Sequence, residues 1–145
     1  MSVCVFFGHK TAPEKIKVVL RSTIIDLIEN KNVDSFYVGN NGAFDYMVKE
    51  SLKSIKKDYP HIKYSVVLAY LPKEKDEFDC RDYSDTIYPE GLEKTPRRFA
   101  ISKRNTWMVN RADFVITYVV HNFGGAAQFK ALAERQNKIV INVCE

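Results

Sequence analysis

This sequence of 145 residues is short of the features that would fix its class at once. Its three cysteines, Cys4, Cys80 and Cys144, form no CxxC pair, so neither a zinc site nor thioredoxin-like chemistry is indicated. No apolar run approaches the roughly 20 residues that span a bilayer. The beginning of the chain also lacks the basic segment and cleavage site of a signal peptide. We therefore expect one cytoplasmic domain, with Cys4 and Cys144 reduced in its core, and with no membrane partner, metal or other cofactor.

The sequence also lacks a large excess of charge of either sign. The chain has 22 Lys and Arg against 18 Asp and Glu, a net charge of +4. This balance suits an anionic ligand, but it is not the concentrated basic stripe of a nucleic-acid-binding protein. We therefore expect a nucleotide-derived small molecule as the partner and do not expect nucleic acid.

Three familiar site motifs are missing. A dinucleotide site needs Gly-x-Gly-x-x-Gly after the first strand and an acidic residue after the second, whereas this chain has the single Gly8 and then Val38-Gly39-Asn40. A P-loop with Gly-Lys-Ser/Thr is absent. A phosphorylated receiver domain is excluded too, because His9 and Lys10 stand where its first acidic cluster belongs.

The hydrophobic pattern predicts an α/β domain. Apolar runs rich in Val, Ile, Phe and Tyr predict buried strands at 3–7, 35–38, 64–70, 114–119 and 139–144. Helical periodicity lies between them, at about 13–29, 42–57, 97–111 and 125–136. The stretch 71–96 has no clear period. Right-handed crossovers then give a three-layer Rossmann-like sandwich with a five-stranded parallel sheet in the order 3-2-1-4-5.

Glycine-bearing turns follow three of these strands: Gly8-His9-Lys10, Gly39-Asn40-Asn41-Gly42, and Phe123-Gly124-Gly125-Ala126. In a parallel sheet the strand-to-helix turns share one edge, so these loops should converge on one crevice. Helix amino ends with close backbone access suit phosphate, and Gly124, Gly125 and Ala126 open a helix. The alternatives are tight packing at Gly8, plain loop charges at His9 and Lys10, and a turn with a helix cap at 39–42.

Several segments together resemble one family. They are FFGHK at 6–10, YVGNNGAFD at 37–45, DTIYPEG at 85–91, RFAI at 98–101, Arg104 with Asn105 and Trp107 to Val109, ADFVI at 112–116, and GGA at 124–126. In order and spacing they resemble the SLOG superfamily, in particular short bacterial or phage members related to the DNA-processing protein DprA and to the Lonely guy enzymes. The resemblance implies a Rossmann-like fold that binds nucleotides or their derivatives, often as a homodimer.

The same resemblance bears on catalysis. Lonely guy enzymes carry Pro-Gly-Gly-x-Gly-Thr-x-x-Glu, and their threonine and glutamate support cleavage of an N-glycosidic bond. Aligned on Gly124-Gly125, this chain has Gln128 in place of the threonine and Ala131 in place of the glutamate. The helical arginine of those enzymes matches Arg104, which otherwise would form an outward ion pair. The phosphate-binding half is thus retained, and the expectation leans against an enzyme.

Three hypotheses follow. The first is a protein that binds a nucleotide or an ADP-ribose-like derivative as a sensor, sequestering protein or regulator. The second is a hydrolase of a nucleotide N-glycosidic or phosphate bond that uses Glu90 or Asp45. The alternatives without a catalytic role are a solvated charge in a turn for Glu90 and a charge that favours the amino terminus of its helix for Asp45. The third, which ranks last, is binding of single-stranded DNA.

Overall fold

The centre of the molecule is a six-stranded parallel sheet. The structure, a computed structural model, describes residues 2–70 and 86–144. The sheet runs in the order β4-β3-β2-β1-β5-β6. Its strands are β1 (Val3–Gly8), β2 (Ser35–Val38), β3 (Lys63–Val67), β4 (Thr86–Ile87), β5 (Phe114–Tyr118) and β6 (Ile139–Asn142). All five neighbouring pairs are parallel.

The predicted fold class is confirmed, with one correction. The five strands expected from the sequence lie in the predicted order 3-2-1-4-5, but a sixth, β4, extends the sheet beyond β3. Strand β4 has only two residues, too few to produce a period, and it pairs with β3 at Val66 and Val67. Residues 71–85, which include Cys80, lie outside the described part of the chain.

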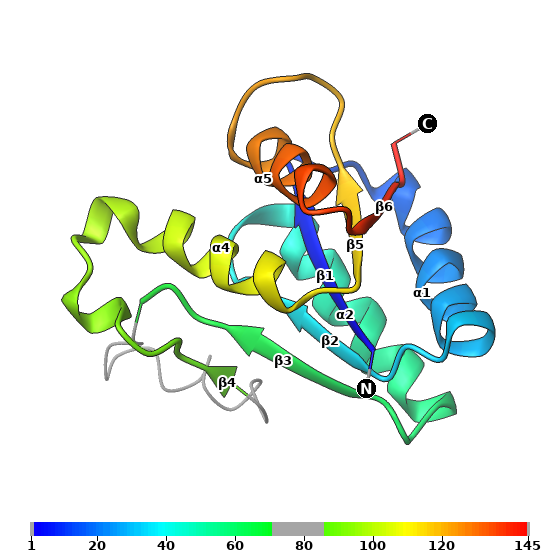
Figure 1. The fold of residues 1–145 in the computed structure, drawn as a ribbon. Coiled ribbons are helices and arrows are strands. Elements are labelled where there is room, and N and C mark those ends of the chain that lie inside the picture. The colour runs from blue at the N-terminus through cyan, green and yellow to red at the C-terminus, as the bar shows by residue number, and fades with distance from the viewer. Residues whose placement is uncertain (1, 71–85, 145) are drawn as a thin grey trace.

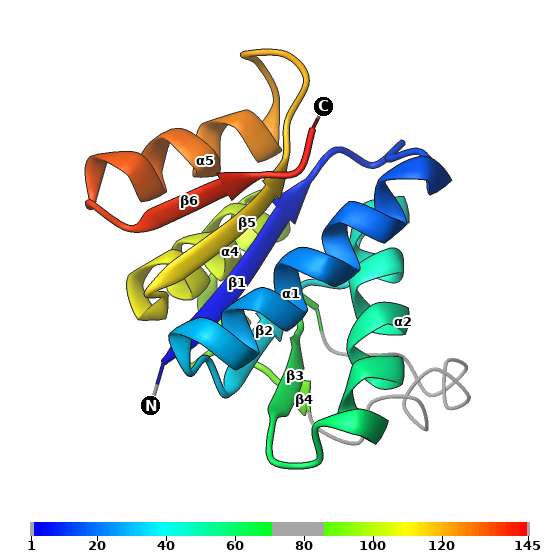
Figure 2. The ribbon, with the colours of Figure 1, turned by 90° about the vertical axis from the view of Figure 1, so that its right-hand side faces the viewer.

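Helices cover both faces of the sheet (Figures 1 and 2). On one side lie α1 (Lys17–Lys31), which follows the short turn η1 (Glu14–Ile16), and α2 (Gly42–Asp58). On the other lie α4 (Ala100–Arg111), preceded by η3 (Leu92–Lys94) and η4 (Arg97–Phe99), and α5 (Gly125–Arg135). The sheet therefore separates two layers of helices, each packed on one of its faces.

Alternation along β1 builds both layers, because successive side chains of a strand point to opposite faces. Cys4 and Phe6 join the core under α1 and α2. Val3, Val5 and Phe7 join the core under α4 and α5. All five are almost completely buried, so β1 reads as an unbroken apolar run.

Helical periodicity also predicts that Val19, in the helix at 13–29, and Trp107, in the helix at 97–111, lie in the core. The structure corrects both positions. Val19, placed on the inner face of its helix by periodicity, is 38% exposed, because the buried stripe of α1 runs instead through Leu20, Ile24, Leu27 and Ile28. Trp107 is half-buried and packs at the edge of the core under α4 and α5.

This topology fixes where a site can form. Strand β1 has β2 on one side and β5 on the other, and the chain leaves β1 and β5 toward opposite faces of the sheet. A crevice at such a switch point lies outside the carboxyl ends of the strands. No helix within residues 2–70 and 86–144 is long and apolar enough to cross a membrane.

Candidate functional site

A cavity of about 270 Å³, here called the main pocket, opens at the carboxyl end of the sheet. It collects the loops after β1 and β2, one face of α4, and the first residues of α5. The predicted site residues in its wall are Gly8, His9, Lys10, Gly39, Asn41, Asp45, Arg104, Gly125 and Ala126. The structure thus brings residues from all three glycine turns to one place.

Other predicted residues lie outside this wall. Asn40 accepts a hydrogen bond from Lys49 Nζ at 2.7 Å, and Gly42 and Gly124 sit at the amino ends of α2 and α5 without lining the pocket. The pocket also takes in Ile101, which the sequence analysis did not select, and Asn105. Helical spacing is a signal for Ile101, which lies three residues before Arg104 on the same side of the helix. Asn105 is the next residue in the chain, and it reaches the pocket wall by accepting a hydrogen bond from Arg104 Nε.

Arg104 is the buried cation of the main pocket, with 2% of its surface exposed. Its Nη1 donates to the Val67 carbonyl and its Nη2 to Asn41 Oδ1, both at 3.0 Å, while Nε donates to Asn105 Oδ1 at 2.7 Å. Burial lowers the pKa of Arg104, and the Asp45 carboxyl opposes that shift. The guanidinium is therefore fixed between β3 and α2 at the pocket wall.

Asp45, in the first turn of α2, is the carboxylate of this wall. Its Oδ2 accepts the backbone N–H of Asn41 at 2.9 Å. Burial raises the pKa of Asp45 to about 6, although the Asn41 N–H and the charges of Arg104 and Lys49 act to lower it. A carboxyl with this pKa is ionised at neutral pH but takes up a proton after a modest fall in pH.

Gly39 permits this arrangement. A Cβ at position 39 would lie 2.9 Å from Cζ and Nη1 of Arg104 and 2.9 Å from Oδ2 of Asp45. The absent side chain therefore makes room for the guanidinium and the carboxylate on either side of the loop.

At Gly8 the structure favours packing over ligand access. A Cβ there would lie 2.3 Å from Cγ of Phe44, a fully buried ring of α2. The next loop residues are also tied to α2, because the Lys10 carbonyl accepts the Ala43 N–H at 2.9 Å. The two loops after β1 and β2 thus form one connected wall.

His9 links the main pocket to the loop between β5 and α5. Its backbone N–H donates to the Tyr118 carbonyl at 3.2 Å, and its Nε2 accepts the Val120 N–H at 3.0 Å. Its ring stacks on His121, with centroids 4.0 Å apart. Burial, and then the neighbouring His121, lower the pKa of His9. The neutral imidazole that accepts the Val120 N–H is therefore the favoured form.

The amino end of α5 faces the main pocket through Gly125 and Ala126. Its N-cap is Gly124, which makes no side-chain capping bond. The first N–H groups of an α-helix have no partner within the helix, and together with the helix dipole they favour an anion. Arg104 and this helix end are two positive features in the wall of one cavity.

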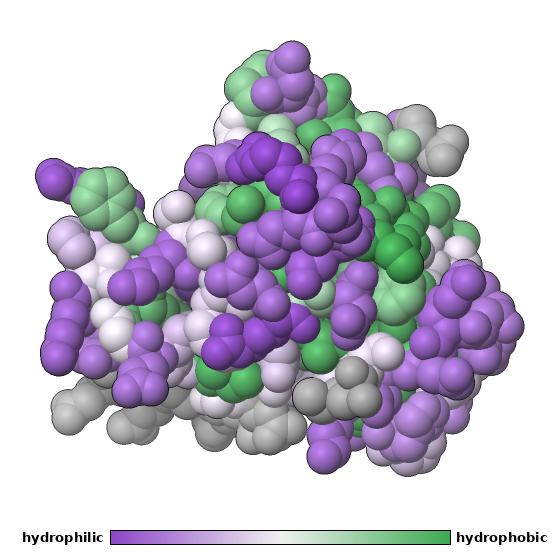
Figure 3. Space-filling view, in the orientation of Figure 1, coloured by the Kyte–Doolittle hydropathy of each residue, from purple (hydrophilic) through white to green (hydrophobic). Residues whose placement is uncertain are grey.

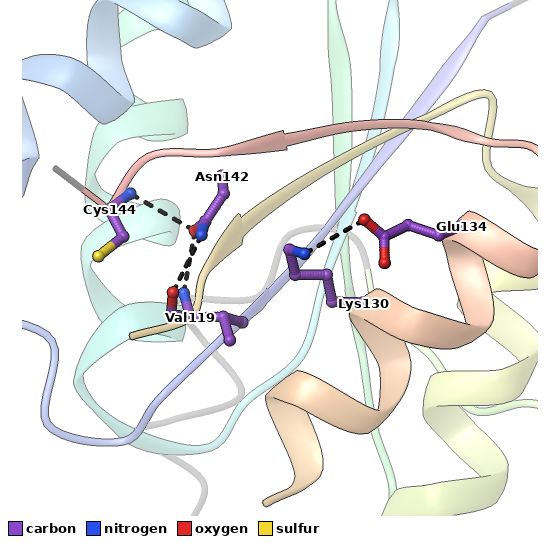
Figure 4. Close-up of polar contacts among 5 residues, drawn as sticks. All are labelled: Val119, Lys130, Glu134, Asn142 and Cys144. Carbon is purple, nitrogen blue, oxygen red and sulfur yellow. Dashed lines mark hydrogen bonds and ion pairs between the residues drawn. The ribbon is translucent and has the colours of Figure 1, made fainter. Parts of the chain in front are cut away.

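Ala131 lines a second cavity, of about 430 Å³, between α5 and the ends of β5 and β6. In the same wall, Lys130 Nζ pairs with Glu134 Oε2 at 3.2 Å (Figure 4). The Asn142 side chain donates to the Val119 carbonyl at 2.9 Å and accepts its N–H at 3.0 Å. The position that matches the Lonely guy glutamate therefore lies apart from Arg104.

Glu90 lines a third cavity, of about 380 Å³, on the other side of α4. That cavity takes Lys103, Trp107 and Asn110 from the helix, whereas the main pocket takes Ile101 and Arg104. The two candidate carboxylates are thus separated by α4, and of the two it is Asp45 that lies beside Arg104.

The comparisons with known proteins agree with this fold. A sequence model described as the YspA SLOG family matches residues 1–139. No curated protein matches the chain.

Two solved structures share the architecture. One is the DNA processing protein A (DprA) of Streptococcus pneumoniae, with a TM-score of 0.70 and 13% identity over 97% of this chain and 49% of that one. The other is DprA of Helicobacter pylori, with a TM-score of 0.66 and 14% identity over 96% of this chain and 63% of that one. This chain thus spans about half of the length of the first and just under two thirds of the length of the second.

These neighbours correct one expectation. The modest net charge predicts that a nucleic acid partner is unlikely, yet the structure of the Helicobacter pylori protein, which shares this fold, is described for its single-stranded DNA binding mode. The prediction is therefore wrong to set nucleic acid aside on net charge. Net charge averages over the whole surface, whereas a backbone-binding groove needs only a local set of donors.

Proposed function

The chain belongs to the YspA SLOG family, and we propose that its main pocket binds the phosphate-bearing part of a nucleotide or of an ADP-ribose-like derivative. The observation that carries the proposal is the buried Arg104 guanidinium in the wall of a cavity that also takes the amino end of α5. The protein would then act as a sensor, sequestering protein or regulator of that ligand.

The chemistry of Arg104 supports this ligand. A guanidinium has five N–H groups, and three of them donate to partners within residues 2–70 and 86–144. The two that have no partner in that part of the chain can donate to a phosphate or ribose oxygen. Because its partners already hold the side chain in place, little side-chain entropy is lost on binding. A cavity of about 270 Å³ is close to the lower end of small-molecule sites, which suits one phosphate and its sugar.

The test uses a charge placed at the helix end. Apart from the adjoining backbone and chain neighbours, no described atom lies within 4 Å of a Cβ built at Gly125, so Gly125→Asp fits sterically. An acidic residue in the first turn also favours the helix. Its carboxylate would nevertheless repel phosphate. The matched control is Gln128→Glu, which makes the same change of charge on an exposed residue of α5 outside the pocket wall.

We expect calorimetric titration of AMP and ADP-ribose to show at least a tenfold loss of affinity in Gly125→Asp. Gln128→Glu should stay within about twofold of the native protein. Equal affinity in the two variants, or no binding of either ligand to the native protein, would overturn the proposal.

Single-stranded DNA is the second candidate, favoured by the fold shared with the two DprA proteins. It predicts that a thymidine 12-mer binds more tightly than a mononucleotide. For single strands the logarithm of affinity falls with the logarithm of salt concentration by about 0.7 per phosphate contacted. A slope that matches several phosphates supports DNA, whereas a slope that matches one or two supports a mononucleotide.

Turnover is the remaining alternative. Chromatography of the same mixtures separates the two roles: recovery of intact ligand supports a binding protein, and released base or sugar phosphate supports a hydrolase. In the second case Asp45→Asn should abolish turnover and leave ligand affinity nearly unchanged.

A further inference from the structure

We propose that the aromatic rings of His9, His121 and Phe123, here called the ring stack, form the base-binding surface of the nucleotide site. An aromatic base would stack on the outer ring, Phe123, while the phosphate of the same ligand lies at the amino end of α5. This inference rests on the proposed nucleotide-binding function and names the part of the ligand that the main pocket alone does not recognise.

The ring stack is continuous and ends in an open face. His9 and His121 have centroids 4.0 Å apart at 25°, and His121 and Phe123 have centroids 3.9 Å apart at 11°. Phe123 is nevertheless 67% exposed. A large ring that stacks nearly parallel on one neighbour and is otherwise mostly exposed offers a flat apolar surface of the kind that stacks any base.

The loop between β5 and α5, which carries His121 and Phe123 of the ring stack, is held at its base. Val119 is tied on both backbone atoms to Asn142 of β6, and the Val120 N–H donates to His9 Nε2. His121 Nδ1 lies 3.0 Å from the Phe123 carbonyl. Figure 3 shows this loop standing out from the body of the molecule, with hydrophobic and hydrophilic residues together on its surface. A surface fixed before binding loses little entropy when a base docks on it.

The ring stack also lies next to the proposed phosphate site. His9 lines the main pocket, so the stack begins at the pocket wall. Phe123 is two residues before Gly125, and two residues of chain span at most about 7 Å. The backbone of Phe123 therefore lies within about 7 Å of the first turn of α5, close enough for the proposed nucleotide to contact both.

The test compares a ligand with a base to one without. Ribose 5-phosphate keeps the sugar and phosphate of AMP but has no base. We expect Phe123→Ala to weaken AMP and ADP-ribose by about 5- to 150-fold, the range of base stacking on an aromatic side chain, and to leave ribose 5-phosphate unchanged. Phe123→Tyr, which keeps the ring, should bind like the native protein. Val120→Ala, at a 54% exposed residue of the same loop, is the matched control.

A second readout reports the stacking itself. The base protons of AMP should shift upfield in the proton NMR spectrum on binding to the native protein and to Phe123→Tyr, but not on binding to Phe123→Ala.

If Phe123→Ala binds AMP normally while Gly125→Asp does not, the ring stack is not the base site and the proposed function stands. If the native protein binds neither AMP nor ADP-ribose, both proposals fail. If Phe123→Ala changes only the sedimentation behaviour of the protein, the ring is a protein contact and the inference is overturned.

Discussion

At the scale of single residues, the central feature is a carboxylate and a guanidinium held on either side of Gly39. Neither side chain is placed by its own helix alone. Arg104 reaches the Val67 carbonyl on β3, and Asp45 accepts an N–H from the loop after β2. Both polar groups are largely removed from water, so their hydrogen bonds must be satisfied within the protein. This makes the loop 39–41 the part of the pocket where a small change has the largest effect.

Asp45 gives the first prediction. Burial raises its pKa to about 6, whereas the unfolded chain should have a value near 3.9. Between these values the folded protein binds a proton that the unfolded chain has released. The contribution of Asp45 to stability is therefore present at pH 4, falls as the pH rises to about 6, and stays low above it. The difference between the two pKa values corresponds to up to about 3 kcal/mol.

Asp45→Asn removes this titration but keeps an oxygen that can accept the Asn41 N–H. We expect urea denaturation to show the variant gaining free energy of unfolding relative to the native protein between pH 4 and pH 7.5, by up to about 3 kcal/mol. Asp26→Asn, at an exposed position of α1, is the control and should show a much smaller change. A difference for Asp45→Asn that is the same at both pH values would contradict the assignment.

At the scale of elements, the loop between β5 and α5 depends on one side chain of β6. Strand pairing gives way after Tyr118, and the Asn142 amide then takes the place of a further backbone pair at Val119. Figure 4 shows both hydrogen bonds. A side chain that supplies both a donor and an acceptor can extend a sheet edge in this way.

Asn142→Ala should therefore loosen this loop while the sheet stays intact. With each of the two lost hydrogen bonds worth about 0.5–1.5 kcal/mol, we expect hydrogen exchange at Val119 and Val120 to accelerate by roughly 5- to 150-fold. Exchange at β1 should stay nearly unchanged. Asn122→Ala, in the exposed part of the same loop, is the control. Unchanged exchange at Val119 in Asn142→Ala would show that the loop is held by other contacts.

At the scale of the whole molecule, the sequence predicted the sheet well because its evidence is local. Each buried parallel strand is a short apolar run, and the handedness of crossovers restricts their order. Strand β4 escaped prediction because its two residues carry no period and pair only through β3. The convergence of the three glycine turns was also predictable, since it follows from the sheet alone.

The details of the pocket depend on contacts between residues that are far apart in the chain, and local sequence patterns do not reveal such contacts. An outward ion pair and an inward guanidinium are equally compatible with the helical spacing of Arg104. The inward position is decided by Val67 and Asn41, which belong to other elements. In the same way, His9 and Phe123 come from loops at opposite ends of the sequence, so their stacking on His121 could not be foreseen.

The last prediction concerns the stability of the whole chain. A ligand that binds only the folded state stabilises it by mass action, by about 2.7 kcal/mol at a concentration 100 times the Kd. For a chain of 145 residues, 1 kcal/mol raises Tm by roughly 2–4 °C. We therefore expect AMP or ADP-ribose at that concentration to raise Tm by about 5–11 °C in the native protein and in Gln128→Glu, and by about half of that or less in Gly125→Asp, whose affinity should be at least tenfold lower. Because the gain comes from the ligand alone, the shift should not depend on protein concentration. An equal rise in Gly125→Asp would mean that the stabilising ligand binds outside the main pocket.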